Sequence, residues 1–383
     1  MKILMLSNDR ALLGEAASTG DTIARHRAYG QFVEKLAIIV LTKKGRFKTN
    51  QLSETVYAYP TNAHGVFCCL KNGLAIAKKL LAAENYDLVV CQDPFLTGLV
   101  GWRLKNKYGL KLLLHFHGDF WDNPYWLKEN IFHLLMLWLS KCTVKRADAI
   151  RVVSGGIKTK ILRAKITKAK IEVIPTPVNL EQFKTPDNQT VISIKNEFPG
   201  QQIILFVGRL SPEKNLPFLI HCFKKIKSDH RNVALIIAGD GPEEPKIRRL
   251  ISALKLERST KLLGRVAYQN LPSYFHAADI FVLPSRHESF GKVILEAAAA
   301  GKPTVASATT GAKEIIIDGK TGFLTPINNG KKFVEKTLLL LTDDVLRIQA
   351  GANAYAQVTQ KYEWQTNLLQ VVSFWQKIIN NKN

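Results

Sequence analysis

Two glutamates, Glu288 and Glu296, lie in the stretch PSRHESFGKVILEAAAAGKPTVAS (284–307) and are separated by seven residues. The apolar run DIFVLPS (279–285) predicts a strand, and SFGKVILEAAAAG predicts a helix that ends at Gly301. The unpaired N–H groups and the positive dipole end of such a helix suit a diphosphate. One carboxylate then faces the mouth of the site and the other lies deeper. The alternative is an ordinary strand–loop–helix unit with two solvated glutamates.

Cations and glycines follow two other predicted strands. Arg209 ends the run IILFVGR (203–209) and Lys214 comes five residues later, so both could converge on phosphate oxygens. The alternative is a pair of solvated surface cations. Gly239 and Gly241 in AGDGPEE permit a tight turn after another strand, although the same glycines would serve any loop.

A pair of histidines ends the run KLLLHFH (111–117). The two-residue period of a strand places His115 and His117 on the same face. A buried histidine hydrogen-bonded to backbone is the alternative to a functional one. No third ligand has the spacing of a metal site, so no metal is expected here.

The elements that must position these residues alternate in type along the chain. Short apolar runs alternate with amphipathic stretches up to residue 180, a Pro-rich linker is expected near 175–190, and the alternation restarts and continues to about 360. This pattern predicts two α/β domains, 1–180 and 190–360, each with a doubly wound parallel sheet and facing each other across a cleft. Ligands bind such sheets beyond the carboxyl ends of the strands.

Composition limits the class of protein. The 383 residues favour two or three domains, and 46% hydrophobic with 22% charged residues is typical of a globular chain. The net charge of +23 favours an anionic partner without choosing among nucleic acid, lipid and phosphorylated ligands. Five cysteines without a C-x-x-C pair, and an amino terminus without a signal-peptide core, predict a cytoplasmic protein.

Five segments taken together resemble the large retaining glycosyltransferase family 4, in the family's order and spacing. ESFGKVILE is similar to the E-x7-E motif of that family. The resemblance extends along almost the whole chain and implies the GT-B fold, with nucleotide-sugar binding by 190–360 and a helix at about 361–383 that returns to the first domain. The segments are VGRLSPEKNLPFLI (207–220), AGDGPEE (238–244), LLGRVAYQNLPSYFHAADIFVLPS (262–285), ESFGKVILEAAAAGKPTVAS (288–307) and GAKEIIIDGKTGFL (311–324).

The resemblance assigns roles to the reactive residues. Arg209 and Lys214 resemble the donor-diphosphate clamp, and His117 matches a histidine that contacts the donor sugar. Glu296 is similar to the glutamate that accepts hydrogen bonds from the ribose. Glu288 is similar to the glutamate beside the transferring sugar, where we assign it positioning and charge stabilisation. The chain contains no D-x-D sequence, so we expect metal-independent chemistry without a cofactor.

The remaining donor contacts are implied mainly through backbone. Arg265 and Val266 wrap the nucleobase, which leaves its identity open, and Gly20 stands where the family has a glycine-rich loop. Lys292 replaces an aliphatic residue of the family and either contacts phosphate or turns outward. The expected donor-binding set is Gly20, Gly239, Gly241, Arg265, Val266, Ser289, Phe290, Gly291, Lys292, Val293 and Glu296.

The predicted function is transfer of a sugar from a UDP- or GDP-sugar to a glycan or lipid-linked acceptor, in polysaccharide or glycolipid biosynthesis. One alternative is a sugar-nucleotide epimerase of the same fold, which would not require an E-x7-E run. Another is a basic nucleic-acid-binding protein. Against it, no helix-turn-helix or RNA-binding motif is present, and the basic residues are not interleaved with aromatic ones.

A basic segment indicates a second partner. Residues 141–170 hold ten Lys or Arg and a single acid, Asp148, directly after the apolar stretch YWLKENIFHLLMLWLS (125–140). This arrangement predicts peripheral contact with an anionic cytoplasmic leaflet. The alternative is a helix buried in the first domain, with solvated basic residues beside it.

Overall fold

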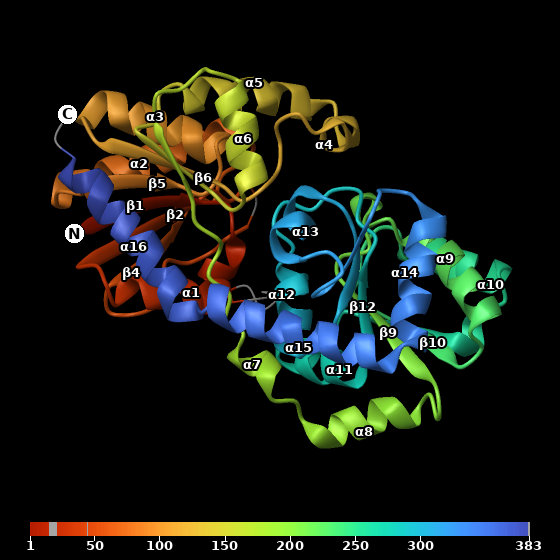
Figure 1. The fold of residues 1–383 in the computed structure, drawn as a ribbon. Helices are drawn as coiled ribbons and strands as arrows, with labels where there is room; N and C mark the ends of the chain where they lie inside the picture. The colour runs from red at the N-terminus through yellow and green to blue at the C-terminus, as the bar shows by residue number, and fades with distance from the viewer. Residues whose placement is uncertain (15–20, 44, 382–383) are drawn as a thin grey trace. The chain divides into compact units, whose positions relative to one another are not determined.

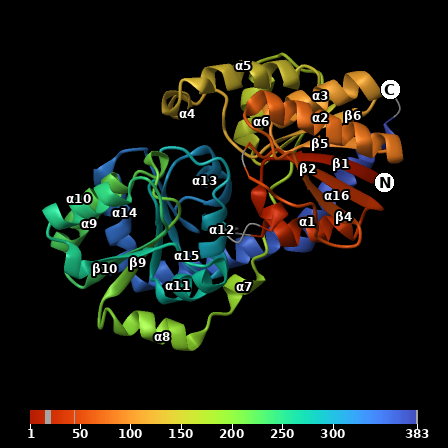
Figure 2. The same ribbon diagram turned by 180° about the vertical axis from the view of Figure 1, so that it is seen from behind.

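The computed structural model describes residues 1–14, 21–43 and 45–381. The chain divides into two compact units. The amino-terminal unit comprises Met1–Val178 and Trp364–Asn383, and the carboxyl-terminal unit comprises Asn179–Glu363. In both units short buried strands alternate with helices that cover either side of a sheet (Figures 1 and 2).

The sheet of the amino-terminal unit has the strand order β3-β4-β2-β1-β5-β6-β7-β8, and every pair is parallel except β3 with β4. Its central strands are buried on both faces, as parallel strands between helical layers must be. The strands are β1 (Lys2–Ser7), β2 (Lys35–Val40), β3 (Asn50–Gln51), β4 (Val56–Pro60), β5 (Leu88–Cys91), β6 (Lys111–Phe116), β7 (Ala149–Val152) and β8 (Lys170–Val173). The helices are η1 (Arg10–Leu13), α1 (Thr22–Gly30), α2 (Val66–Ala83), α3 (Leu96–Tyr108), α4 (Pro124–Glu129), α5 (Phe132–Val144), α6 (Gly155–Arg163) and α16 (Trp364–Asn380).

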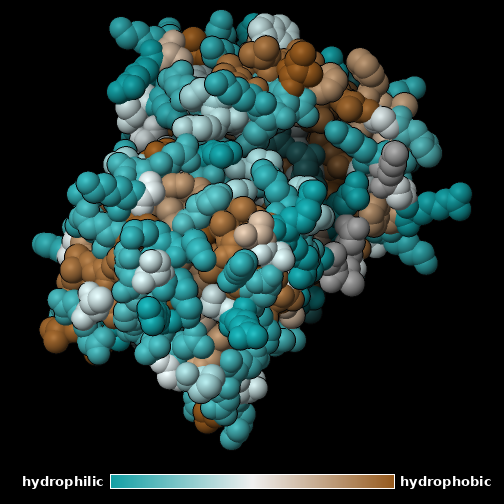
Figure 3. All heavy atoms as spheres, turned by 90° about the vertical axis from the view of Figure 1, so that its right-hand side faces the viewer, coloured by the Kyte–Doolittle hydropathy of each residue, from teal (hydrophilic) through white to brown (hydrophobic). Residues whose placement is uncertain are grey.

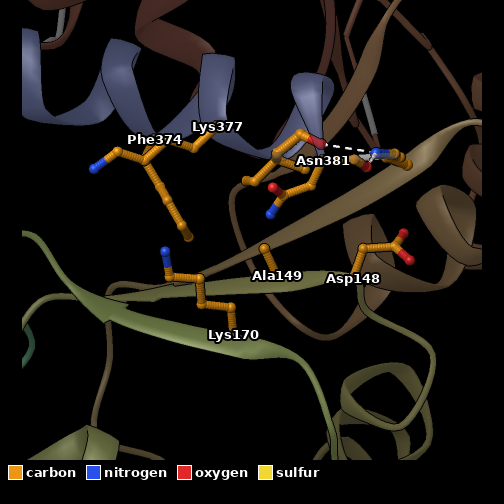
Figure 4. Close-up of a pocket in the computed structure, with 8 residues that line it drawn as sticks. Asp148, Ala149, Lys170, Phe374, Lys377 and Asn381 are labelled. Atoms are coloured by element: carbon orange, nitrogen blue, oxygen red, sulfur yellow. Dashed lines mark hydrogen bonds between the residues drawn. The ribbon is translucent and has the colours of Figure 1, made fainter. Parts of the chain in front are cut away.

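The last helix, α16, belongs to the core of the amino-terminal unit. Trp375 is fully buried, and its ring lies 5.1 Å from that of Tyr29 in α1. Lys111 Nζ donates to the Ile378 carbonyl at 2.9 Å, which satisfies an acceptor that the end of the helix leaves open. Figure 4 shows this end of α16 above β7 and β8. The returning segment is therefore an integral layer of the first unit.

The sheet of the carboxyl-terminal unit has the order β11-β10-β9-β12-β13-β14 and is parallel throughout. The chain builds outward from β9 to β11, then returns to the other side of β9 and continues outward from β12. The strands are β9 (Gln202–Val207), β10 (Val233–Ala238), β11 (Thr260–Gly264), β12 (Ile280–Leu283), β13 (Thr304–Ser307) and β14 (Gly322–Thr325). The helices are α7 (Glu181–Lys184), α8 (Asn188–Asn196), η2 (Pro212–Lys214), α9 (Leu216–Asp229), α10 (Glu244–Ala253), η3 (Glu257–Ser259), η4 (Tyr268–Asn270), α11 (Leu271–Ala277), α12 (Lys292–Ala299), α13 (Thr310–Ile315), α14 (Gly330–Thr342) and α15 (Asp344–Lys361).

The segment expected as an extended linker near 175–190 is not extended throughout. It contains α7, and α8 begins at Asn188. Phe183 explains the difference, because it is fully buried and packs edge-on against Tyr268 and Phe275 at about 5.5 Å. Its burial outweighs the polar and proline-rich composition around it.

We predict that Trp375→Ala destabilises the amino-terminal unit by roughly 3–5 kcal/mol, because the substitution leaves a cavity under α16. All six tryptophans of the chain lie in this unit, so tryptophan fluorescence during urea unfolding follows it selectively. Leu369→Ala is the control, since Leu369 is on the same helix and 45% exposed. Equal unfolding midpoints for both variants would contradict this placement of α16.

Candidate active site

The predicted reactive residues of the carboxyl-terminal unit gather where β9 and β12 end. Arg209 follows β9, and Glu288 lies in the loop between β12 and α12. These two strands are neighbours in the sheet, and the chain reverses its direction of growth between them. Loops diverge at such a switch point and leave room for a ligand.

Lys214 and Glu288 are in direct contact. Lys214 Nζ donates to Glu288 Oε2 at 2.5 Å, and both side chains are less than one-fifth exposed. A backbone hydrogen bond of 2.8 Å from Arg286 N to Glu213 O joins the same two loops. The structure thus pairs a cation and a carboxylate that are 74 residues apart in the sequence.

Glycines hold the loop that carries Arg209, whose side chain is exposed. Gly239 has a φ of +147°, and a Cβ atom on it would lie 1.8 Å from the Gly208 carbonyl oxygen. A Cβ atom on Gly241 would lie 2.4 Å from the Leu210 carbonyl oxygen. Only glycine allows the loops after β9 and β10 to approach this closely. This packing requirement is itself sufficient to explain both glycines.

Glu296 is a buried carboxylate with two polar neighbours. It lies just over one turn into α12, is 2% exposed, and accepts a hydrogen bond of 3.0 Å from the Tyr268 hydroxyl. Lys292 Nζ lies 3.6 Å from the same oxygen and 4.5 Å from the centre of the Tyr268 ring. Lys292 therefore turns toward Glu296 and Tyr268.

Tyr268 and Gly311 are two residues that the sequence analysis did not assign to the site. Tyr268 stands in GRVAYQNLP, the segment expected to wrap the nucleobase, so its position was a usable signal. Gly311 N donates to the Glu288 carbonyl at 2.7 Å, and a Cβ atom there would lie 2.5 Å from Phe290 N. Gly311 thus fixes the backbone beside Glu288, which strand–helix patterns do not reveal.

The start of α12 differs slightly from the predicted one. The helix begins at Lys292, whereas the predicted stretch SFGKVILEAAAAG begins at Ser289, and Gly291 is its N-cap with a φ of +85°. Phe290 is buried and packs near Tyr362 at 6.1 Å, so a ligand could meet it only through backbone. Ser289, Val293 and Val266 are half-buried and Arg265 is exposed. Gly20 lies outside the described residues.

His117 lies in the amino-terminal unit, directly after β6. Its Nε2 donates to Gln92 Oε1 at 2.8 Å, and this tautomer leaves Nδ1 as an acceptor that faces Thr176 Oγ1 at 3.4 Å. Gln92 follows β5, the neighbour of β6 in the sheet, so His117 stands at the carboxyl ends of β5 and β6, one strand away from the switch point between β1 and β5. Burial, together with the charge of Arg151, holds the pKa of His117 well below its usual range. The ring is therefore neutral at pH 7.

Arg151 is a buried cation behind the histidines. It is 2% exposed and donates to the carbonyls of Ile174 at 3.0 Å and Pro175 at 2.7 Å. Its Nη1 lies 3.5 Å from Nδ1 of the buried His115. Arg151 thus ties the chain after β8 to the carboxyl end of β7.

The described residues lack two features, a helix that could span a membrane and a cluster of metal ligands. None of their helices combines the length and apolar character that a membrane crossing requires. No group of three or more His, Cys, Asp and Glu side chains among them is arranged to hold a metal ion.

The fold is that of the GT-B glycosyltransferases, as comparison with solved structures shows. Sucrose-phosphate synthase of Thermosynechococcus elongatus matches with a TM-score of 0.85 and 21% identity over 100% of both chains. Anabaena HepE in complex with UDP-glucose matches with a TM-score of 0.80 and 20% identity, over 98% of this chain and 100% of that one. The predicted class, GT-B with two Rossmann-like parallel-sheet domains, is confirmed.

Sequence comparison identifies the family. The models described as "Glycosyltransferase Family 4" and "Glycosyl transferases group 1" match residues 38–182 and 187–357. An uncharacterized glycosyltransferase of Methanocaldococcus jannaschii is 29% identical over 81% of this chain and 80% of its own length. The phosphatidylinositol N-acetylglucosaminyltransferase GPI3 subunit of Saccharomyces cerevisiae is 26% identical over 61% of this chain and 52% of its own. The chain belongs to glycosyltransferase family 4.

Buried neutral histidines make the amino-terminal unit sensitive to acid. Burial lowers the pKa of His26 from 6.5 to about 4, and it holds the pKa values of His115 and His117 well below their usual range. The unfolded chain therefore binds more protons than the native one below pH 6.5. Above this pH the histidines do not lower the free energy of unfolding. Below it, the free energy of unfolding falls as pH decreases, by about 1.4 kcal/mol per pH unit for each histidine.

We expect the urea midpoint of the amino-terminal unit, followed by tryptophan fluorescence, to fall between about pH 7 and pH 5. His26→Gln should reduce the pH dependence of the free energy of unfolding by the equivalent of about one proton. The same change at the exposed His64 should not reduce it. A midpoint that stays constant over this range would contradict the burial of neutral histidines.

Proposed function

We propose that the protein is a retaining glycosyltransferase that transfers a sugar from a nucleotide-diphosphate donor to a glycan or lipid-linked acceptor. The contact between Lys214 and Glu288 at the β9–β12 switch point carries this proposal, because it joins a phosphate-binding cation to a carboxylate beside the start of α12. The UDP-glucose in the HepE structure supports a UDP-sugar as donor.

Nucleotide binding is assigned to the opposite end of the site. The ribose hydroxyls donate to Glu296, whose carboxylate is oriented by Tyr268 at 3.0 Å and whose charge is favoured by Lys292 at 3.6 Å. Arg265 and Val266 provide backbone contacts to the base. The diphosphate lies against the N–H groups that begin α12.

Bond breaking requires stabilisation of charge on two groups. As the bond between the sugar C1 and the diphosphate breaks, negative charge grows on the leaving phosphate, where Arg209 and Lys214 stabilise it. Positive charge grows on the sugar ring, where Glu288 stabilises it. The acceptor hydroxyl attacks C1 from the face that the phosphate leaves, and its proton passes to a phosphate oxygen. His117, a neutral ring whose Nδ1 is a hydrogen-bond acceptor, contacts the donor sugar.

The acceptor and the setting complete the proposal. The name of the GPI3 subunit specifies a phosphatidylinositol substrate for that relative, which supports a lipid-linked acceptor for this chain. We place the protein on the cytoplasmic face of a membrane, in polysaccharide or glycolipid biosynthesis. No metal ion or other cofactor takes part in the proposed reaction.

Glu288→Gln should lower the transfer rate by roughly 100-fold or more while UDP binding changes little, because only the transition state carries the charge that Glu288 meets. Glu296→Ala should instead weaken UDP binding, measured by calorimetry. Glu335→Gln on α14 is the control, since it removes an exposed carboxylate charge that pairs with Lys332 on its own helix. Normal turnover of Glu288→Gln would reject the assignment.

Arg209→Ala should lower kcat more than it raises KM, since the leaving-group charge is largest in the transition state. Arg248→Ala, which removes an exposed arginine from α10, should leave both constants unchanged. Chelation with EDTA should have no effect on the wild-type protein. Activity that disappears with EDTA and returns with manganese or magnesium would show that the metal-independent mechanism is wrong.

A further inference from the structure

The helix α5 presents an apolar surface to solvent. Its first turns expose Phe132, Leu134, Leu135 and Trp138, each at least 60% exposed, and Ile131 just before the helix is 81% exposed. The buried residues of the helix, Ser140, Thr143 and Val144, lie at its end. The alternative considered from the sequence, a helix buried in the first domain, is therefore wrong for these turns. Figure 3 shows hydrophobic side chains at the top of the view, where Figure 1 places α4 and α5.

This surface has a defined orientation. Residues 131, 135 and 138 follow the helical spacing of three and four, so they lie along one stripe, and Lys141 and Lys145 continue the same stripe. Trp126 of α4 stacks on His133 of α5 with ring centres 4.2 Å apart, and His133 Nδ1 donates to the Trp126 carbonyl at 2.6 Å. The short helix α4 thus braces α5 from one side.

Exposed cations border the end of the stripe. Lys141, Lys145 and Arg146 stand at the end of α5, and Arg163, Lys165 and Lys168 stand at the end of α6 and after it. A cavity of about 310 Å³ lies between the two groups and is lined by Lys141, Lys160 and Arg163, with Trp121, Leu137 and Asp122. We call the six exposed cations the basic rim, which consists of Lys141, Lys145, Arg146, Arg163, Lys165 and Lys168.

Not every basic residue of the segment belongs to the rim. Arg151 is buried and bound to carbonyls, so it contributes no surface charge. Lys160 is paired with Asp119 at 2.8 Å. The one acid of the segment, Asp148, is paired with Lys105 at 2.5 Å and accepts from Leu112 N at 2.7 Å. The rim therefore has an excess of positive charge.

We propose that α5 docks the protein on the surface of an anionic phospholipid bilayer. The exposed apolar stripe enters the boundary between headgroups and acyl chains, Trp138 lies at the polar edge, and the basic rim contacts lipid phosphates. The charge of the surface favours this partner, because an apolar, Trp-bearing helix beside exposed cations matches an anionic leaflet. The inference deepens the proposed function by naming the surface that brings the amino-terminal unit to a lipid-linked acceptor.

Vesicle flotation of the full chain tests the proposal. The wild-type protein should float with vesicles of equimolar phosphatidylcholine and phosphatidylglycerol, less with phosphatidylcholine alone, and less as salt increases. Leu135→Glu with Trp138→Glu should abolish flotation, and both positions are exposed enough for the fold to tolerate charge. Lys165→Gln and Lys168→Gln should each weaken binding roughly fivefold.

The matched control is Val345→Glu with Ile348→Glu on α15, which changes two apolar residues that are more exposed than Leu135 and Trp138 and should leave flotation unchanged. UDP binding, measured on every variant, should be unaffected, so a failure of docking is distinguishable from a failure of the proposed transferase. Equal binding to neutral and anionic vesicles at low salt would overturn the proposal. The proposal would also be overturned if the wild-type protein did not float and formed a dimer that Leu135→Glu with Trp138→Glu dissociates. The apolar surface of α5 would then be covered by a second copy of the chain.

Discussion

The pairing of β9 with β12 is the constraint on which the candidate active site depends. Parallel register of Ile204 with Ile280 and of Leu205 with Phe281 brings the ends of two strands together, although two further strands and three α-helices, α9 to α11, separate them in the chain. The loops after two neighbouring parallel strands leave the sheet at the same edge, and this brings Lys214 and Glu288 into contact. Gly239 and Gly311 then close the neighbouring loops around them at distances that a side chain would prevent.

Buried polar groups give the two units different kinds of rigidity. Glu296 is held by the Tyr268 hydroxyl, which follows β11, and by the Lys292 ammonium group, which follows β12. Its carboxylate is therefore oriented before a ligand binds. Arg151 is satisfied mainly by backbone carbonyls, which fixes the path of the chain after β8. In both cases the cost of burying charge is offset by hydrogen bonds with specific geometry.

The amino-terminal unit combines a tightly packed interior with an unusually apolar surface element. α16 fills one side of its sheet with Trp375 and neighbouring side chains, while α5 leaves its bulky residues in water. An isolated helix face of this kind costs solvation free energy in a free protein. The basic rim beside it gives the surface a chemical character that differs from that of the candidate active site at the ends of β9 and β12.

The amino-acid sequence by itself predicted the alternation of strands and helices and, through its resemblance to a family, the GT-B class, and it made Glu288, Glu296, Arg209 and Lys214 candidates for the site. These depend on local periodicity and on short segments in a fixed order. Tertiary structure alone decided that Lys214 touches Glu288, that Tyr268 holds Glu296, that Arg151 is buried and that the first turns of α5 are exposed. The reason is physical: such contacts depend on strand order and on which helix face is covered, and residues far apart in the chain decide both.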